Sequence, residues 1–220
     1  MRLQTKVWPL FSTNQYALAQ DCVAGKSLNL EGTSNGSFPS ITYGGRTVTL
    51  TSPNDLSGIN FTINGFYYGQ PVSKTIAGPN ANTIEVGTTP DFYFDSIVAI
   101  VPDASLVGAE ISAGTGFHGN LNPFLISAAL SVVNLSFSYQ ITGNLTFNQY
   151  VSLFNPNKEY PEVGVNEDHF RDINGQMGVN ASGSSSLSSF PIQMLFVEII
   201  DGDDTGTMEF EVLQSGISDA

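Results

Sequence analysis

Alternating hydrophobic residues between Val48 and Gly116 constrain the fold of this chain more than any other feature. A strand with one face in a core and the other in water places apolar side chains at every second position. Clusters of Gly, Pro and Asn separate the apolar runs at intervals of roughly 8 to 12 residues, the spacing of an all-β sandwich or barrel. The alternating residues are Val48, Leu50, Ile59, Phe61, Ile63, Val72, Phe92 and Phe94.

A second antiparallel β region is predicted after residue 118. Apolar residues alternate with polar ones in residues 135–141 and 145–153, and Gly143-Asn144 between them can turn the chain, so this segment predicts a hairpin. Two later strands are predicted at residues 192–200 and 208–212.

These patterns predict two β domains. Residues 1–118 are expected to form an N-terminal arm followed by a β-sandwich or barrel module. Residues 119–220 are expected to form an acidic, jelly-roll-like domain with a long polar loop at 155–189. Near the start, Ser12-Thr13-Asn14 could cap a short turn of helix through residues 15–20.

Three segments also resemble a module that is common in virion proteins of tailed bacteriophages. They read TLTSPNDLSGINFTING at 49–65, GQPVSKTIAGPNANTIEVGTTPDFYFDSIVAIVPDA at 69–104 and GAEISAGTG at 108–116. A looser match at residues 17–32 extends the resemblance over roughly the first half of the chain. The resemblance implies a structural role on the head or the tail of a particle, and it brings no catalytic residues with it.

The chain has few charged residues, and most of them are acidic. Charged residues make up 12% of the chain, the net charge is −13, and seven Lys and Arg are spread along the whole length. A nucleic-acid groove needs clustered basic residues, so we expect no nucleic-acid partner. Up to His118 there are eight acidic and five basic residues, and after it twelve acidic and two basic. We therefore expect the C-terminal part to face outward or to meet a basic partner.

Cysteine content and hydropathy bear on the compartment. Cys22 is the single cysteine, so no disulfide can form within the chain. The first residues lack the apolar core of a signal peptide, and no apolar run approaches a membrane span. The expectation is a protein made in the host cytoplasm and located in the virion, with no membrane partner.

Two groups of residues could bind a metal. Asp201, Asp203 and Thr205 match the opening of a calcium loop, but Val212 stands where the closing Glu belongs, so a plain acidic turn is the stronger interpretation. Residues 167–169 with Asp172 place carboxylates beside an imidazole, and a solvated loop is favoured there. We predict no catalytic residues, no cofactor and no enzymatic activity.

Aromatic residues near the N-terminus are the candidates for partner binding. Trp8, Phe11 and Tyr16 could anchor the chain in a neighbouring subunit, because aromatic side chains are enriched at such contacts. Packing in the core of the chain itself is the alternative, and it is favoured for Trp8 and Phe11.

The sequence therefore leads to three functional hypotheses, given in order of preference. The first is a capsid decoration or cement protein that binds the major capsid protein or other virion proteins and forms homo-oligomers, with trimers favoured. The second is a tail or head-to-tail component. The third, ranked lower, is a carbohydrate-binding module of a tail spike or fibre, in which exposed tyrosines stack on sugars; its candidates are Tyr67, Tyr68, Tyr93 and Tyr150.

Overall fold

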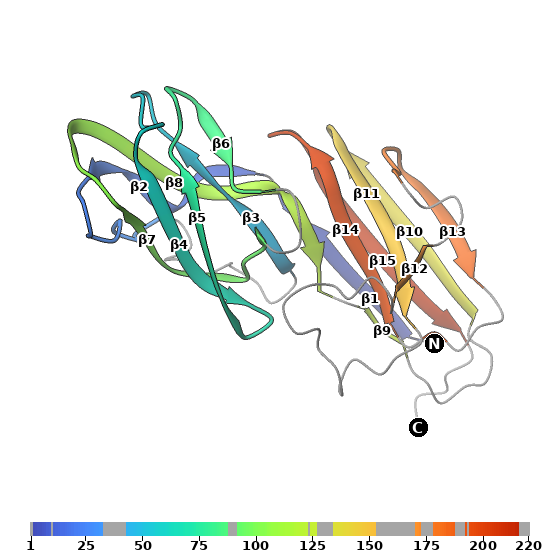
Figure 1. The fold of residues 1–220 in the computed structure, drawn as a ribbon. Coiled ribbons are helices and arrows are strands. Elements are labelled where there is room, and N and C mark those ends of the chain that lie inside the picture. Colours follow the sequence, from blue (N-terminus) through green and yellow to red (C-terminus); the bar gives the residue numbers. More distant parts are fainter. Residues whose placement is uncertain are drawn as a thin grey trace. The chain divides into compact units, whose positions relative to one another are not determined.

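The computed structural model describes residues 2–9, 11–32, 43–87, 92–122, 124–126, 134–152, 170–172, 178–187, 192 and 194–215. Strands and their connections make up these ranges, and the sheets are antiparallel, so the all-β prediction is confirmed (Figure 1). Within the same ranges, the structure contains no helix whose length and apolar character would suit a membrane crossing.

The strands are numbered in chain order. They are β1 (Arg2–Trp8), β2 (Ser12–Cys22), β3 (Tyr43–Thr51), β4 (Asn60–Tyr67), β5 (Gln70–Ala77), β6 (Thr83–Glu85), β7 (Ser96–Pro102), β8 (Leu106–Leu121), β9 (Phe124–Leu125), β10 (Asn134–Thr142), β11 (Leu145–Ser152), β12 (Phe170–Asp172), β13 (Gly183–Leu187), β14 (Met194–Gly202) and β15 (Thr207–Ser215).

The chain forms two compact units. The middle unit is continuous and comprises Phe11–Gly119, whereas the terminal unit combines Met1–Leu10 with Asn120–Ala220. The sequence analysis grouped residues 1–10 with the N-terminal module as an arm. In the structure they belong to the terminal unit instead, because β1 pairs with β15 along its whole length, from Arg2↔Gln214 to Trp8↔Met208.

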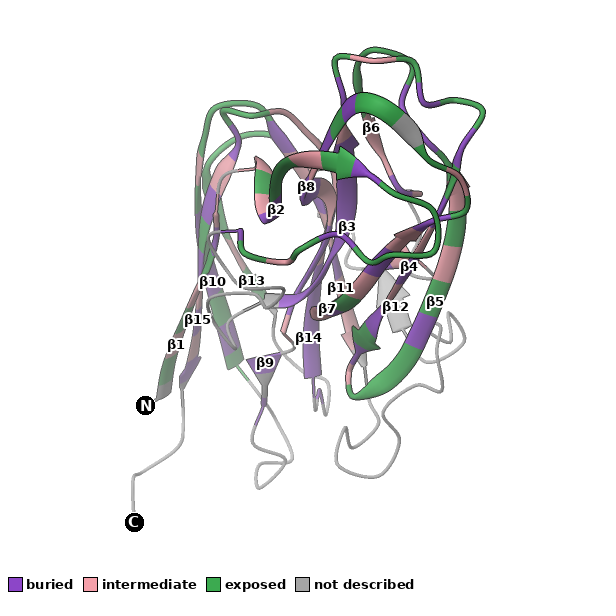
Figure 2. Ribbon diagram, turned by 90° about the vertical axis from the view of Figure 1, so that its left-hand side faces the viewer, coloured by how far each residue is buried: buried purple, intermediate pink, exposed green. Residues whose placement is uncertain are grey.

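The middle unit contains two sets of hydrogen-bonded strands. One is the three-stranded sheet β5-β4-β7, and the other has the order β8-β3-β6 with β2 paired to β8. Alternate residues of β4 are buried, which matches the sequence pattern, and Figure 2 shows the same alternation along β5. Buried side chains from both sets form one hydrophobic cluster that includes Val48, Leu50, Phe61 and Ile63.

The terminal unit has Phe210 of β15 at the centre of its aromatic core. One sheet has the order β1-β15-β10-β13, and the other contains β12-β11-β14 with β9 paired to β14. The ring of Phe210 lies 5.9 Å from Phe147 and 5.4 Å from Phe124, which belong to the opposite sheet, and 5.9 Å from Tyr139 of its own sheet. The two sheets are therefore packed through aromatic contacts.

The helical turn predicted at residues 15–20 is wrong. These residues lie in β2, which pairs with β8 through Ala17↔Ala113 and Gln20↔Ile111 and has several register shifts. The capping signal at Ser12-Thr13-Asn14 describes a local preference, and pairing with a strand far along the chain overrides it.

The hairpin predicted between residues 135 and 153 is also wrong. Both strands exist, but β10 pairs with β13 and β15, whereas β11 pairs with β12 and β14. The turn at Gly143-Asn144 carries the chain from one sheet to the other, as the turn at residues 203–206 does between β14 and β15. The alternating pattern is the same for two strands of a hairpin and for two strands that face each other across a core.

Residues 155–189 contain strands that the sequence analysis did not predict. Phe170–Asp172 form β12, and Gly183–Leu187, which include the serine run, form β13 on the edge beside β10. Serine has little intrinsic preference for strands, so the pairing with β10 is needed to explain β13. The predicted strands at 192–200 and 208–212 are confirmed as β14 and β15, whereas residues 153–169 and 173–177 lie outside the described residues.

Gly143 offers a test of the turn between the two sheets. Its φ is +74°, and a Cβ there would overlap the carbonyl oxygen of Thr205, whereas Gly178 has φ +64° and open space around it. We expect Gly178→Ala to cost about 1–2 kcal/mol through the backbone conformation alone. Gly143→Ala should cost roughly 1–2 kcal/mol more because of the close approach.

Denaturant unfolding followed by fluorescence measures both variants. The single tryptophan, Trp8, lies in the terminal unit with both glycines and reports on its unfolding. Equal losses of stability in the two variants would contradict the close packing of the turns at 143–144 and 203–206.

Candidate functional site

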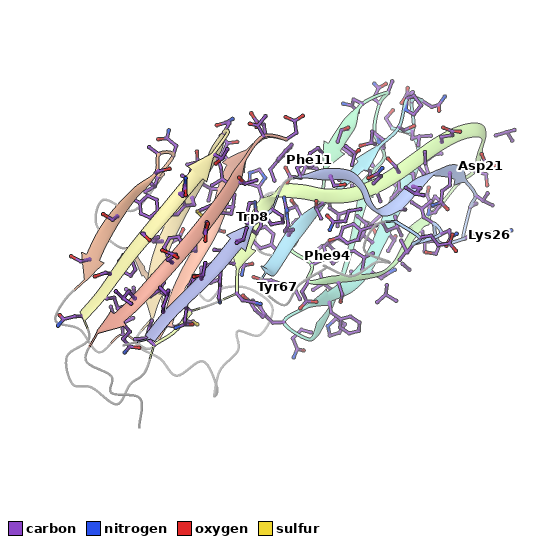
Figure 3. All side chains as sticks on the ribbon, turned by 180° about the vertical axis from the view of Figure 1, so that it is seen from behind. Trp8, Phe11, Asp21, Lys26, Tyr67 and Phe94 are labelled. Atoms are coloured by element: carbon purple, nitrogen blue, oxygen red, sulfur yellow. The ribbon has the colours of Figure 1, made fainter. Side chains whose placement is uncertain are left out.

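The aromatic residues predicted to bind a partner lie in or beside β1 and β2, and Tyr16 is inside β2. Figure 3 labels Trp8 at the end of β1 and Phe11 just before β2. Trp8 is 1% exposed and Tyr16 is 0% exposed, so both side chains pack inside the chain. Phe11 is half-buried and stacks on Phe117, with ring centroids 4.4 Å apart. None of the three offers a large free surface, which agrees with the alternative of core packing.

The acidic turn between β14 and β15 is held by its own hydrogen bonds. The carboxylate of Asp203 accepts hydrogen bonds from the backbone N–H of Thr205 at 2.8 Å and from its hydroxyl at 2.5 Å. These bonds lower the pKa of Asp203. Asp201 accepts a bond from the N–H of Gly202 at 2.9 Å. The oxygens proposed as calcium ligands thus stabilise the turn itself, and calcium binding there stays a prediction.

Among the residues that the structure describes, no three His, Cys, Asp or Glu side chains are grouped so as to hold a metal ion. Residues 167–169 lie outside those ranges. Cys22 is buried, and its Sγ lies 3.5 Å from the carbonyl oxygen of Ala104.

Glu85 is the centre of a polar cluster in the middle unit, formed with Thr47 and His118. The hydroxyl of Thr47 donates a hydrogen bond to Oε1 of Glu85. The backbone N–H of His118 donates to the same oxygen at 2.9 Å, and Nδ1 of His118 lies 3.0 Å from Oε2. Strands β3, β6 and β8 are neighbours, and this brings the three side chains together. Gly116 is required beside them, because a Cβ there would overlap Thr47 and Glu85.

The cluster has the residue types of a catalytic triad but a different geometry. In a triad the imidazole accepts the proton of the hydroxyl nucleophile, and the carboxylate orients the imidazole. Here the acceptors for the hydroxyl of Thr47 are the carboxylate of Glu85 and the backbone carbonyl oxygen of His118, so its proton is not directed to the imidazole. Burial alone would raise the pKa of Glu85, but hydrogen bonds from His118 and Thr47 outweigh it and lower the pKa. The cluster therefore stabilises an ionised Glu85 and joins three strands.

Replacing Glu85 should make the middle unit less sensitive to acid. Because the pKa of Glu85 is lower in the folded chain than its ordinary value of 4.5, its contribution is complete above that value and disappears as the pH falls through the folded pKa. We expect Glu85→Gln to cost about 1–2 kcal/mol at pH 7 and much less at pH 3.

Thermal unfolding followed by circular dichroism at both pH values measures this change. Glu110→Gln is the matched control, because Glu110 is exposed on β8 of the same unit. An equal loss at pH 7 and pH 3 would contradict the role of the ionised carboxylate.

Lys6 is an inward-pointing lysine on β1 of the terminal unit. Its ammonium group donates to the carbonyl oxygen of Asn122 and lies 4.4 Å from the centre of the Phe124 ring. Burial lowers the pKa of Lys6 to about 7. Within the described strands β1 is at the edge of its sheet, and a lysine in such a strand hinders edge-to-edge aggregation.

The stability of the terminal unit should therefore depend on Lys6 in alkaline solution. Between pH 7 and 10 the unfolded chain binds the Lys6 proton and the folded chain does not, so the folding free energy improves as the pH rises. From pH 6 to 10, we expect the parent chain to gain about 4 kcal/mol relative to Lys6→Met, measured by urea unfolding with Trp8 fluorescence. Lys26→Met, at an exposed position, should show no such difference. Parallel pH profiles for the parent and Lys6→Met would contradict the burial of this amine.

The sheet β5-β4-β7 has an outward face without ionisable side chains, which we call the neutral face. The strand registers place twelve exposed or half-exposed residues on it. Phe66 is 40% exposed, and Val98, at the register shift between β4 and β7, is 60% exposed. The face consists of Asn60, Thr62, Asn64, Phe66, Pro71, Ser73, Thr75, Ala77, Ser96, Val98, Ala99 and Val101.

Polar side chains of the neutral face are bonded to one another across the strands. The hydroxyls of Thr62 and Thr75 lie 2.9 Å apart, and the hydroxyl of Ser73 donates to Oδ1 of Asn64 at 2.7 Å. Asn60 donates through Nδ2 to Asp103, beside the face, at 2.7 Å. If a partner covered this face, fewer polar groups would lose hydrogen bonds to water than on an ordinary polar surface.

Sequence reasoning did not identify the neutral face. The alternation in β4 predicts that Asn60, Thr62, Asn64 and Phe66 share one side. The partners β5 and β7 follow from non-local pairing, and the position of Val98 depends on the register shift, which has no local signal. That this side lacks charged residues follows only from the registers of the three strands.

No protein-family model matches the chain, and no curated protein sequence matches it. Among solved structures, it is similar to a chain in the structure of infectious bursal disease virus, Gx strain, with 11% sequence identity and a TM-score of 0.23. The match covers 96% of this chain and 70% of that one. Similarity at this level supports no inference about function, so the proposals below depend on the residues and geometry of the chain itself.

Proposed function

We propose that the chain is a non-enzymatic structural protein of a virion, and specifically a capsid decoration or cement protein that binds the outer capsid surface and stabilises the head. The observation that carries this proposal is the neutral face. An uncharged sheet surface with exposed Phe66 and Val98 suits contact with another protein surface. The segments that resemble a phage virion module, at residues 49–65 and 69–104, include β5, β7 and most of β4.

The physical task of such a protein is to bury surface across the boundaries between capsid subunits. The added contacts oppose the outward pressure of the packaged genome. The acidic terminal unit, with exposed Glu209 on β15, would remain in solvent. Its partners would be the major capsid protein, other virion proteins and further copies of the chain, and trimers would suit local threefold positions of the capsid lattice.

The tail or head-to-tail alternative uses the same surfaces in a smaller number of copies. The carbohydrate-binding alternative is less well supported, because two of its four tyrosines are inside the core. Tyr67 is 3% exposed and Tyr93 is 1% exposed, and their rings pack edge to face at 6.1 Å. The hydroxyl of the half-buried Tyr150 donates to Glu198 at 3.1 Å.

Counting the protein in purified particles tests the proposal. We expect a copy number comparable to that of the capsid lattice sites, in the hundreds per particle, with density on the outer surface of the head. Quantitative mass spectrometry relative to the major capsid protein, followed by low-resolution cryo-electron microscopy, measures both. A count of about three to a few dozen copies would contradict the decoration role and favour the tail. Absence of the chain from purified particles would contradict the virion role altogether.

A further inference from the structure

We infer that the neutral face is a self-association surface, on which the same face of a second copy packs sheet against sheet. The inference refines the assembly role proposed above, on which its biological use rests. It depends on three properties of the middle unit: the closure of both sheet edges, the distribution of charge, and the size of the face.

Both edges of the sheet are closed to an additional strand. On β5, Pro71 lacks the N–H that a new strand would need, and Lys74 adds a charged side chain. On β7, the backbone carbonyl oxygens of Ile100 and Pro102 already accept hydrogen bonds from Leu28 and Gly25, each at 2.8 Å. Strand addition at the edges is therefore disfavoured, and the outward face is the part of the sheet that remains available.

The charge of the chain restricts where a second copy can bind. Two chains that each carry a net charge of −13 repel each other, so they can approach most easily through a surface without charge. A basic partner would gain nothing from the neutral face and would instead bind where carboxylates are exposed. The face also presents apolar side chains, Phe66 and Val98, which can interdigitate with their copies.

The size of the face sets the strength of the contact. Three strands of about eight residues cover about 400 Å² per copy, or about 800 Å² for the pair. A stable pair in solution usually buries about 1,200–2,000 Å², so the contact should be weak between isolated molecules. Many such contacts in an ordered assembly act together. Contact between two identical faces is twofold, so it would join neighbouring oligomers rather than form a trimer by itself.

Sedimentation of the full chain over roughly 0.01–1 mM tests the inference. We expect reversible dimer formation that strengthens as salt rises from about 0.05 to 0.5 M, because salt screens the repulsion between acidic chains. A chain that stays monomeric across this range would overturn the inference. Association that weakens with added salt would also overturn it, because it would indicate a contact between opposite charges.

Single aspartate substitutions locate the contact. Val98→Asp adds a negative charge to the contact surface of each copy and should weaken dimer formation roughly tenfold or more. Val107→Asp is the matched control, because Val107 is 100% exposed in β8 outside the neutral face and the net charge changes equally. Thr75→Asp, on exposed β5, is a second variant of the face and should act like Val98→Asp. Equal effects of Val98→Asp and Val107→Asp would place the contact elsewhere.

The solution test and the particle test are independent. A monomeric chain found in hundreds of copies per particle would overturn the self-association surface alone. A chain that dimerises through the neutral face but is absent from particles would overturn the virion role alone.

Discussion

The pairing of β1 with β15 is the interaction on which the terminal unit depends. It joins the first strand of the chain to the last, and β15 carries Phe210, the centre of the aromatic core. Without β1, the strand that bears Phe210 would be at the edge of its sheet, and Lys6 and Trp8 would leave the core side. The pairing also means that the continuous middle unit is inserted between two parts of the terminal unit. Residues 2–8 are therefore a structural strand and are not a free arm for docking.

Much of the fold could be predicted from alternation alone, and the errors have a common physical cause. The pattern at Phe61 and Ile63, or at Phe210 and Val212, identifies a strand because each residue's face follows from its own position. It does not identify the partner strand. The false hairpin at Gly143-Asn144, the false helical turn at 15–20 and the missed β13 all depend on pairing between distant segments. The same limit applies to the neutral face and to the Glu85 cluster, which each draw on three strands.

The polar groups of the chain stabilise its structure, and the neutral face is free for contact. Thr47, Glu85 and His118 satisfy one another, and the carboxylate of Asp203 closes its own turn. Uncharged side chains on β4 and β5 form hydrogen bonds with one another, and apolar groups of the same face remain exposed. Such a surface can be covered at low cost in desolvation, which fits the proposed role of adding contacts within an assembly.

The most direct test of this account compares hydrogen exchange in two proteins, the full chain and a variant that lacks residues 1–10. The account predicts that β10, β14 and β15 lose protection, because the terminal unit lacks an integral strand, while the strands of residues 11–119 keep theirs. Protection that survives in β10 and β15 would contradict the account and would return residues 1–10 to the role of a free arm. Loss of protection throughout the chain would contradict the division into two units.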